Sequence, residues 1–232
     1  MGSEMCIRDS TQHYFIMKTI FLVFALLGLI HAADPTAPDW PSRFSQTFNE
    51  DLTYPIIGTG KTNGTLYYDW EAKRYRVDRD NGKWDRYCGT IYKFTDTPCS
   101  HIVVDGKRYL HFPDKNYCCM CCTDQGGCGL LKPDWMSSAV FEGEVVDEKT
   151  KNTVQIFNNK GLQDNRVYYD KASGKMLRIA QGTNDDQKYS VDSFNTDFNK
   201  SVLDLPQACD PSKKCSTFSI CGALNSVQAN LV

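Results

Sequence analysis

Short runs of alternating apolar and polar residues make up most of the chain from residue 42 onward. GTLYYDW and KRYRVDR are separated by two residues, and Asp105-Gly106 joins HIVV to KRYLHF. Such alternation is typical of half-buried antiparallel strands, and Asp-Gly favours the tight turn of a hairpin. Later runs are AVFEGEVV, TVQIF, NRVYYD, KMLRIAQ and QKYSVDSF. The pattern predicts roughly ten strands.

Helix signals are few, and residues 42–50 and 195–203 are the two segments in which we expect a short helix. Regularly spaced strands in one domain of about 200 residues predict a barrel, a half-barrel or a sandwich. The chain is rich in aromatic residues, with 12 Tyr and 12 Phe. These residues fill the core of a closed sandwich, whereas in a curved sheet they also line a cavity. The pattern alone leaves both arrangements open.

The N-terminal segment predicts export from the cell. From Met17 the chain has one lysine, an apolar run over residues 20–30 and then small residues. This layout is that of a signal peptide, and the run is too short to span a membrane. We assign residues 17–32 to the signal peptide and residues 33–41 to an extended leader. Residues 1–16 contain MGSEMCIRDS, which resembles a translated sequencing-library adapter, and we exclude them from the fold.

Ten cysteines lie between residues 88 and 221, and the eleventh is Cys6 in the excluded segment. An even number in an exported chain predicts complete disulfide pairing. Four of them form CCMCC at residues 118–122, where the C-x2-C spacing also fits zinc or redox chemistry. We favour disulfides, and because bonding between adjacent cysteines is strained, we expect these four to reach different partners. The expected disulfide cysteines are Cys88, Cys99, Cys118, Cys119, Cys121, Cys122, Cys128, Cys209, Cys215 and Cys221.

The CCMCC cluster lies in a segment, residues 113–136, that has little apolar alternation. We therefore expect a long Cys-rich loop that the bridges fix in place of hydrophobic packing. It either borders a pocket mouth or acts only as a surface clamp. The mouth or lid candidates are Met120, Leu130, Leu131, Trp135 and Met136.

Charge and motif content argue against several functions. The formal net charge is −2, which gives no electrostatic case for binding nucleic acid. No G-x-S-x-G elbow, P-loop or dinucleotide glycine pattern is present, and Asn184-Asp185-Asp186 is more typical of a turn than of a calcium loop. His101 and His111 flank one hairpin turn, and we expect both on the surface. We therefore expect no enzyme, no cofactor and no metal, and after the signal peptide no membrane span.

Arg74, Arg76 and Arg178 stand among apolar strand residues. We expect them to face outward and to be paired with acidic groups.

The hairpins and the segment that follows them resemble a known family. LYYDWEAKRYRV, VYYDKASGKMLRI and QKYSVDSFNTDFNKSVLDLPQAC are similar to segments of ependymin-related secreted glycoproteins, whose broader relatives are LolA-like and LppX-like. The resemblance covers residues 42–209, which we take as a single domain. The Cys-rich cluster and the Cys-containing tail of residues 210–232 depart from the family pattern.

The resemblance implies a mainly β fold: a strongly curved antiparallel sheet, an open half-barrel, with a few short helices at its mouth. It implies a secreted glycoprotein, with sequons at Asn63 and Asn199, that binds a lipid or other hydrophobic small molecule in an apolar pocket. Strand residues are the lining candidates, and because side chains alternate between faces we expect about half to be right. They are Tyr67, Tyr75, Val77, Ile91, Phe94, Val103, Tyr109, Phe141, Ile156, Tyr168, Leu177 and Ile179.

Two other classes of function stay open. One is an extracellular matrix or cell-surface interaction protein with a closed core, which predicts no cavity large enough for an acyl chain. The other is a cysteine-rich inhibitor or defence module, which predicts an exposed rigid loop at residues 113–135.

Overall fold

A computed structural model describes residues 34–54, 58–93, 95–160 and 164–229, with side chains to residue 225. The chain divides into two units, Met1–Pro35 and Thr36–Val232, and the fold is that of the second. The signal peptide of residues 17–32, the adapter-like residues 1–16 and the pocket candidate Phe94 lie outside the described residues.

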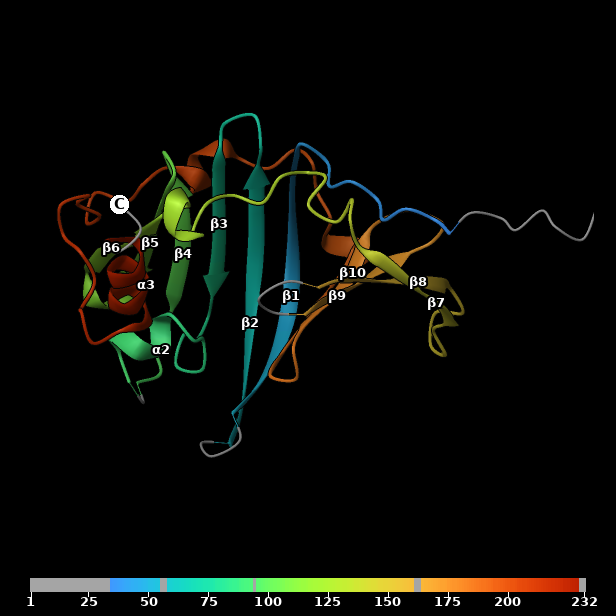
Figure 1. The fold of residues 1–232 in the computed structure, drawn as a ribbon, viewed down its shortest axis with the longest axis horizontal. Coiled ribbons are helices and arrows are strands. Elements are labelled where there is room, and N and C mark those ends of the chain that lie inside the picture. Colours follow the sequence, from blue (N-terminus) through green and yellow to red (C-terminus); the bar gives the residue numbers. More distant parts are fainter. Residues whose placement is uncertain (1–33, 55–57, 94, 161–163, 230–232) are drawn as a thin grey trace, which may run out of the picture. The chain divides into compact units, whose positions relative to one another are not determined.

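Within the described residues, eleven antiparallel strands form one sheet that is not closed into a barrel (Figure 1). The order is β6-β5-β4-β3-β2-β1-β11-β10-β9-β8-β7, so β6 and β7 form its two edges. The predicted open, curved antiparallel sheet is confirmed. The strands are β1 (Arg43–Tyr54), β2 (Gly58–Asp69), β3 (Arg74–Arg79), β4 (Cys99–Val104), β5 (Lys107–Phe112), β6 (Tyr117–Thr123), β7 (Val140–Val146), β8 (Thr153–Asn159), β9 (Asn165–Asp170), β10 (Met176–Gln181) and β11 (Asp185–Tyr189).

The helices are short. They are α2 (Cys88–Ile91), α3 (Ile220–Ala229) and the 3-10 turns η1 (Pro113–Lys115), η2 (Asp124–Gly126), η3 (Val191–Ser193) and η4 (Lys200–Leu203). Helix α3 packs against β6 and η2. The prediction that the helices lie at the mouth holds only in part. The N-cap residue of α2, Tyr87, lines the concave cavity, whereas η4 supplies a carbonyl to Arg76 on the convex face. No helix of the described residues is long and apolar enough to cross a membrane.

The helix expected over residues 42–50 is wrong, because this segment is part of β1. Phe44, Phe48 and Leu52 are four residues apart, a spacing that fits a helix as well as a strand. Gln46 and Glu50 between them are also buried, so the true period is two. Pairing with β2 along all twelve residues of β1 fixes the strand. Of the helix expected over 195–203, only η4 forms.

The two YYD hairpins are built in the same way. In the β2–β3 turn, Asp69 Oδ1 accepts a hydrogen bond from the Ala72 backbone N–H at 2.9 Å, and in the β9–β10 turn Asp170 Oδ2 accepts one from Ser173 at 2.9 Å. Tyr68 and Tyr169, which precede these aspartates, are both buried in one core on the concave face. The aspartate thus closes the turn.

CCMCC lies in β6 and not in a loop, so the prediction of a loop over all of residues 113–136 is wrong. Strand β6 pairs with β5, and its free edge bonds to the C-terminal tail: Met120 N–H donates to the Lys213 carbonyl at 2.8 Å, and Cys215 N–H to the Met120 carbonyl at 2.9 Å. The tail therefore covers this edge of the sheet, which protects it from pairing with other chains.

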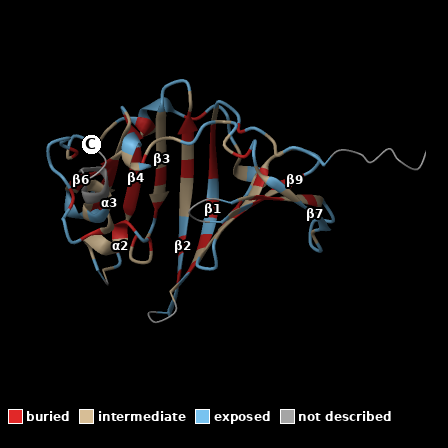
Figure 2. Ribbon diagram, viewed as in Figure 1, coloured by how far each residue is buried: buried red, intermediate tan, exposed pale blue. Residues whose placement is uncertain are grey.

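All ten cysteines of the described residues form disulfides, as predicted. Three bridges join β6 to the C-terminal part of the chain, one at Cys209 and two in the tail that follows it, and the adjacent cysteines do reach different partners. Figure 2 shows buried segments at this end of the sheet, where the half-cystines belong to two hydrophobic clusters apart from the main core. The bridges are Cys88–Cys99, Cys118–Cys209, Cys119–Cys215, Cys121–Cys221 and Cys122–Cys128.

Candidate functional site

The concave face of the sheet holds a cavity of about 930 Å³. This volume is in the range of pockets that enclose small molecules, about 300–1,000 Å³. Residues of the central strands form its floor, and residues 127–135 form a wall across it. Its apolar and aromatic lining consists of Trp40, Leu52, Tyr54, Leu66, Tyr75, Tyr87, Leu130, Leu131, Trp135, Ile179 and Tyr189.

Hydrogen bonds to backbone groups fix the wall. The Tyr68 hydroxyl donates to the Leu131 carbonyl at 2.9 Å, and Asn159 Nδ2 donates to the Trp135 carbonyl at 2.8 Å. The Trp40 backbone N–H donates to the Pro133 carbonyl at 3.0 Å. The wall is thus tied to β2, to β8 and to the segment before β1, so it is part of the fold.

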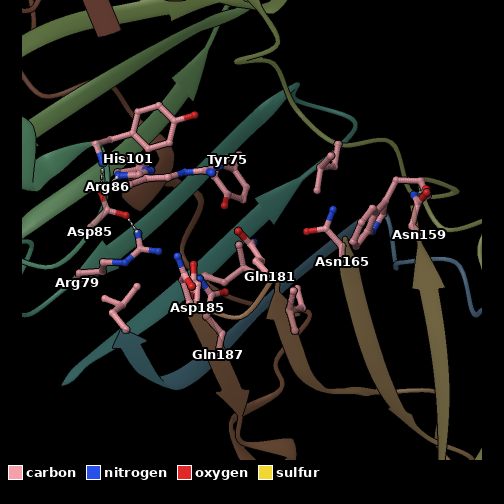
Figure 3. Close-up of a pocket in the computed structure, with 18 of the residues that line it drawn as sticks. Tyr75, Arg79, Asp85, Arg86, His101, Asn159, Asn165, Gln181, Asp185 and Gln187 are labelled. Carbon is pink, nitrogen blue, oxygen red and sulfur yellow. Dashed lines mark hydrogen bonds and ion pairs between the residues drawn. The ribbon is translucent and has the colours of Figure 1, made fainter. Parts of the chain in front are cut away.

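A buried polar network forms part of the floor (Figure 3). Arg79 from β3 makes two hydrogen bonds to the Glu50 carboxylate from β1, at 2.6 and 2.9 Å. From β11, Gln187 Nε2 donates to Glu50 Oε1 at 2.6 Å and the Tyr189 hydroxyl donates to Gln187 Oε1 at 2.6 Å. Glu50 is only 1% exposed. A charge at such depth is tolerated because the bidentate guanidinium pairs with it.

Asp85, just before α2, joins this network to β4. Its Oδ1 lies 2.9 Å from His101 Nε2 and accepts backbone N–H groups of Tyr87 and Cys88 at 2.9 and 2.8 Å, while Oδ2 lies 3.7 Å from Arg79 Nη1. Burial alone would raise the pKa of Asp85, but His101, Arg79 and the N–H donors outweigh it and hold that pKa well below its usual range. Burial lowers the pKa of His101 despite Asp85. We therefore treat His101 as a neutral ring that donates to an ionised Asp85.

Asp185, the first residue of β11, also lines the cavity and lies beside Glu50. Burial, and then the neighbouring Glu50 carboxylate, raises the pKa of Asp185 to about 8. A hydrogen bond between the Asp185 and Glu50 carboxyl groups adds to this rise, while Oδ1 of Asp185 is buried and accepts no hydrogen bond from a described donor. At neutral pH this carboxyl group is therefore mostly protonated.

The structure brings together five of the predicted pocket and mouth residues. Tyr75 and Ile179 line the cavity from the floor, and Leu130, Leu131 and Trp135 line it from the wall. Three more candidates lie on the concave face outside this lining. Val77 is in the core cluster, Phe141 packs against that cluster, and Val103 lines a separate cavity of about 440 Å³.

The remaining pocket candidates among the described residues do not lie in the cavity, so their predicted placement is wrong. Four of them are at strand positions whose side chains point to the convex face: Tyr67, Tyr109, Ile156 and Tyr168. Tyr67 pairs with Arg76, Tyr109 with Ile102, and Ile156 with Tyr168. Leu177 falls at the register shift between Met176 and Arg178 in β10, and Ile91 is in α2, against the cysteine cluster.

Two mouth candidates are also misplaced. Met120 packs on the convex side of β6 with Cys118, and Met136 is 2% exposed in the core. The surface placement expected for His101 is wrong, since it is buried on Asp85, while His111 is half-buried on the opposite face. The outward, paired arginines are confirmed: Arg74 bonds Asp204, Arg76 bonds Asp78 and Arg178 bonds Asp186.

Sequence reasoning missed the polar floor and Trp40. Glu50 stands in register with Phe48 and Leu52, so a period of two in β1 would have placed it on the buried face. Trp40 lies in the segment taken as an extended leader, yet it is 6% exposed and packs edge-to-face on Tyr68 and Trp135. A single large aromatic residue among Pro and Asp was the available signal.

Fold and site define a class of protein: an open, curved antiparallel sheet with a walled cavity on its concave face. No family model matches the chain, and no curated protein matches it. Three solved structures illustrate its similarities in fold. An uncharacterized conserved protein from Thermus thermophilus is 12% identical, with 72% of this chain and 86% of that chain covered and a TM-score of 0.44.

A chain of the MucA/MucB complex of Pseudomonas aeruginosa is 11% identical. The match covers 73% of this chain and 57% of that chain, with a TM-score of 0.37. The LolA superfamily protein NE2245 from Nitrosomonas europaea is 7% identical. The match covers 72% of this chain and 92% of that chain, with a TM-score of 0.34. The fold assignment itself rests on the strand order and pairing given above, and a relation to ependymin-related proteins stays a prediction.

Proposed function

We propose that this protein is a secreted, disulfide-bonded glycoprotein that binds a lipid or other hydrophobic molecule in the concave cavity. The observation that carries the proposal is the cavity itself, about 930 Å³ between the wall and the sheet. A ligand that covers its aromatic and aliphatic lining gains roughly 25 cal/mol per Å² of apolar area removed from water. We propose binding without catalysis, because the sequence contains no nucleophile elbow, P-loop or dinucleotide glycine pattern.

An interaction protein without a ligand was expected to have a closed core. The cavity of about 930 Å³ argues against a closed core and so against this alternative. The inhibitor alternative requires an exposed rigid loop at residues 113–135. Much of this segment is instead strand β6 or cavity wall, and its cysteines are buried.

Export and glycosylation are part of the proposal and have separate support. Five disulfides are typical of proteins that fold in an oxidising compartment. The sequon residues Asn63 and Asn199 are both exposed, on β2 and before η4. Expression in eukaryotic cells with and without a glycosidase step tests this part: secreted protein that shows no mass loss contradicts glycosylation.

Native mass spectrometry of the secreted protein, followed by organic extraction, tests ligand binding. We expect a stoichiometric mass excess, beyond glycans and five disulfides, that disappears on denaturation and yields a defined lipid. A protein that is free of ligand and takes up neither fatty acids nor phospholipids would contradict the proposal.

A matched pair of variants locates the ligand. Leu131 lines the cavity and is 45% exposed, so Leu131→Asp is expected to fold and to reduce uptake. Val140 on edge strand β7 is 59% exposed and is not part of the lining, so Val140→Asp is the control that leaves uptake unchanged. Equal uptake by both variants would place the ligand elsewhere.

A further inference from the structure

Arg108 on β5 lines the cavity with a guanidinium group that has no anionic partner among the described residues. The side chain is half-buried, it forms no ion pair or hydrogen bond with any described residue, and its Nε is buried without an acceptor. Its guanidinium carbon lies 5.4 Å from the centre of the Tyr87 ring. Such a contact uses the flat face of the guanidinium group and leaves its N–H groups available. A buried donor without an acceptor is unfavourable, so an anion that reached Arg108 would be bound favourably.

The aspartates that line the cavity are engaged elsewhere or lie across the sheet. Asp85 is held by His101 at 2.9 Å and lies 3.7 Å from Arg79. Asp185 is hydrogen-bonded to its neighbouring carboxyl group in the floor. Asp164 is exposed and precedes β9, and both β9 and β11 lie beyond β1 from β5 in the strand order. None of these carboxyl groups neutralises the guanidinium group on β5.

The other two arginines of the lining differ from Arg108. Arg79 makes two hydrogen bonds to the Glu50 carboxylate. Arg86 is exposed, lies 5.2 Å from the centre of the Tyr87 ring and has a further interaction within the chain. An anion that entered the cavity would therefore meet Arg108 as a guanidinium group that no described carboxylate already occupies.

Tyr75 supplies a second donor beside this arginine. In the register of the sheet, Tyr75 pairs with Val103 and Val103 pairs with Arg108. The two residues thus lie in one row on the concave face, two strands or about 10 Å apart at the backbone, a distance that their long side chains can bridge. Burial raises the pKa of Tyr75, and the Arg108 charge is the strongest influence that opposes this rise. The Tyr75 hydroxyl makes no hydrogen bond to a described residue, and Figure 3 shows this side chain on the same side of the cavity as His101.

We propose that the ligand of this cavity is an amphiphile with a carboxylate head group, which binds Arg108 and the Tyr75 hydroxyl while its hydrocarbon chain lies against the apolar wall. This inference rests on the proposed function and names the ligand class. The fork of N–H groups on one guanidinium matches the two oxygen atoms of a carboxylate. Leu130 and Leu131 of the wall line the same cavity and supply apolar surface for the chain. A cationic head group would instead be repelled by Arg108.

Isothermal titration calorimetry of the secreted protein after delipidation, with four probes at neutral pH, tests the inference. The probes are decanoate, decanol, decyltrimethylammonium and acetate, and the carboxylates are ionised at this pH. We expect decanoate to bind at least about tenfold more tightly than decanol, because it adds a charge-assisted hydrogen bond. Decyltrimethylammonium should bind most weakly of the three decyl probes.

Arg108→Met removes the charge and keeps a long side chain. In this variant decanoate should bind no more tightly than decanol, and retained decanol binding shows that the cavity is intact. Arg108→Lys keeps the charge and should still prefer decanoate to decanol. Arg166→Met is the matched control: it removes the same charge from a residue that is paired with Glu142 and is not part of the lining, so all affinities should be unchanged.

The outcomes separate the two proposals. Decanol binding without a preference for decanoate, or a preference that survives Arg108→Met, would overturn the head-group inference and leave the hydrophobic cavity standing. Tighter binding of decyltrimethylammonium than of decanoate would overturn it as well. Failure of every decyl probe to bind would overturn the proposed function itself. Equal affinity for acetate and decanoate would contradict an amphiphile and indicate a small free anion.

Discussion

Removing one of the three bridges between β6 and the tail is expected to destabilise the protein far less than its span suggests. Cys118–Cys209, Cys119–Cys215 and Cys121–Cys221 have sequence separations of 91, 96 and 100 residues. For an isolated bridge of this span, the loss of loop entropy in the unfolded chain corresponds to about 4.7 kcal/mol.

The three bridges are not isolated, however. Their tail cysteines follow one another at six-residue steps, and their β6 cysteines are one or two residues apart. With two bridges intact, the third closes a ring of only about seven or eight residues, which is worth about 2.4 kcal/mol. Loss of any one should therefore cost about 2.4 kcal/mol, and loss of all three about 9.5 kcal/mol, which exceeds three single losses by about 2 kcal/mol.

Urea unfolding of paired Cys→Ala variants under non-reducing conditions measures these values. Packing losses from the missing sulfur atoms enter the single and the triple variants alike, so the excess of the triple variant is the informative quantity. Cys88–Cys99 closes a separate loop, with a sequence separation of 11. The free energy of unfolding lost on its removal should therefore add to the loss from any other bridge. A single-bridge loss near 4.7 kcal/mol, or strict additivity among the three, would refute the reasoning.

Three further predictions concern the concave face. The free energy of unfolding should fall as the pH rises from about 4 to about 8, because folded Asp185 holds its proton to about pH 8 and unfolded Asp only to about 3.9; Asp185→Asn should flatten this curve in urea titrations from pH 4 to 9. Arg79→Met leaves Glu50 buried without its cation and should cost about 3–5 kcal/mol in urea unfolding, so a loss below about 1 kcal/mol would contradict the described pair. Gly64→Ala places a methyl group against the Phe48 ring and should lower stability by about 1–3 kcal/mol, and an unchanged thermal midpoint would exclude that contact.

Much of the sheet could be predicted from the chain because its hairpins carry local signals. Asp105 and Gly106 both have positive φ, at 52° and 69°, as the tight turn between β4 and β5 requires. Strands β1 and β6 were missed for opposite reasons. The apolar spacing of β1 also fits a helix, and CCMCC in β6 shows no alternation because disulfides hold it on both faces.

The site was less accessible to sequence reasoning. The sequence shows which alternate residues of a strand share a face. Which of the two faces lines the cavity depends on pairings between distant segments. One register shift in β10 sufficed to misplace Leu177. Glu50 and Arg79 are 29 residues apart and meet only because β2 lies between their strands, so their pairing has no local signature.

The bridges between β6 and the tail also determine what a protease can release from the protein. Cys118, Cys119 and Cys121 precede Cys128, and their partners all lie at or after Cys209. A single cut of the peptide chain anywhere between Cys128 and Cys209 therefore leaves two fragments joined by three covalent links. In a medium rich in proteases, a nicked molecule would keep both halves of its sheet together, and only reduction would separate them.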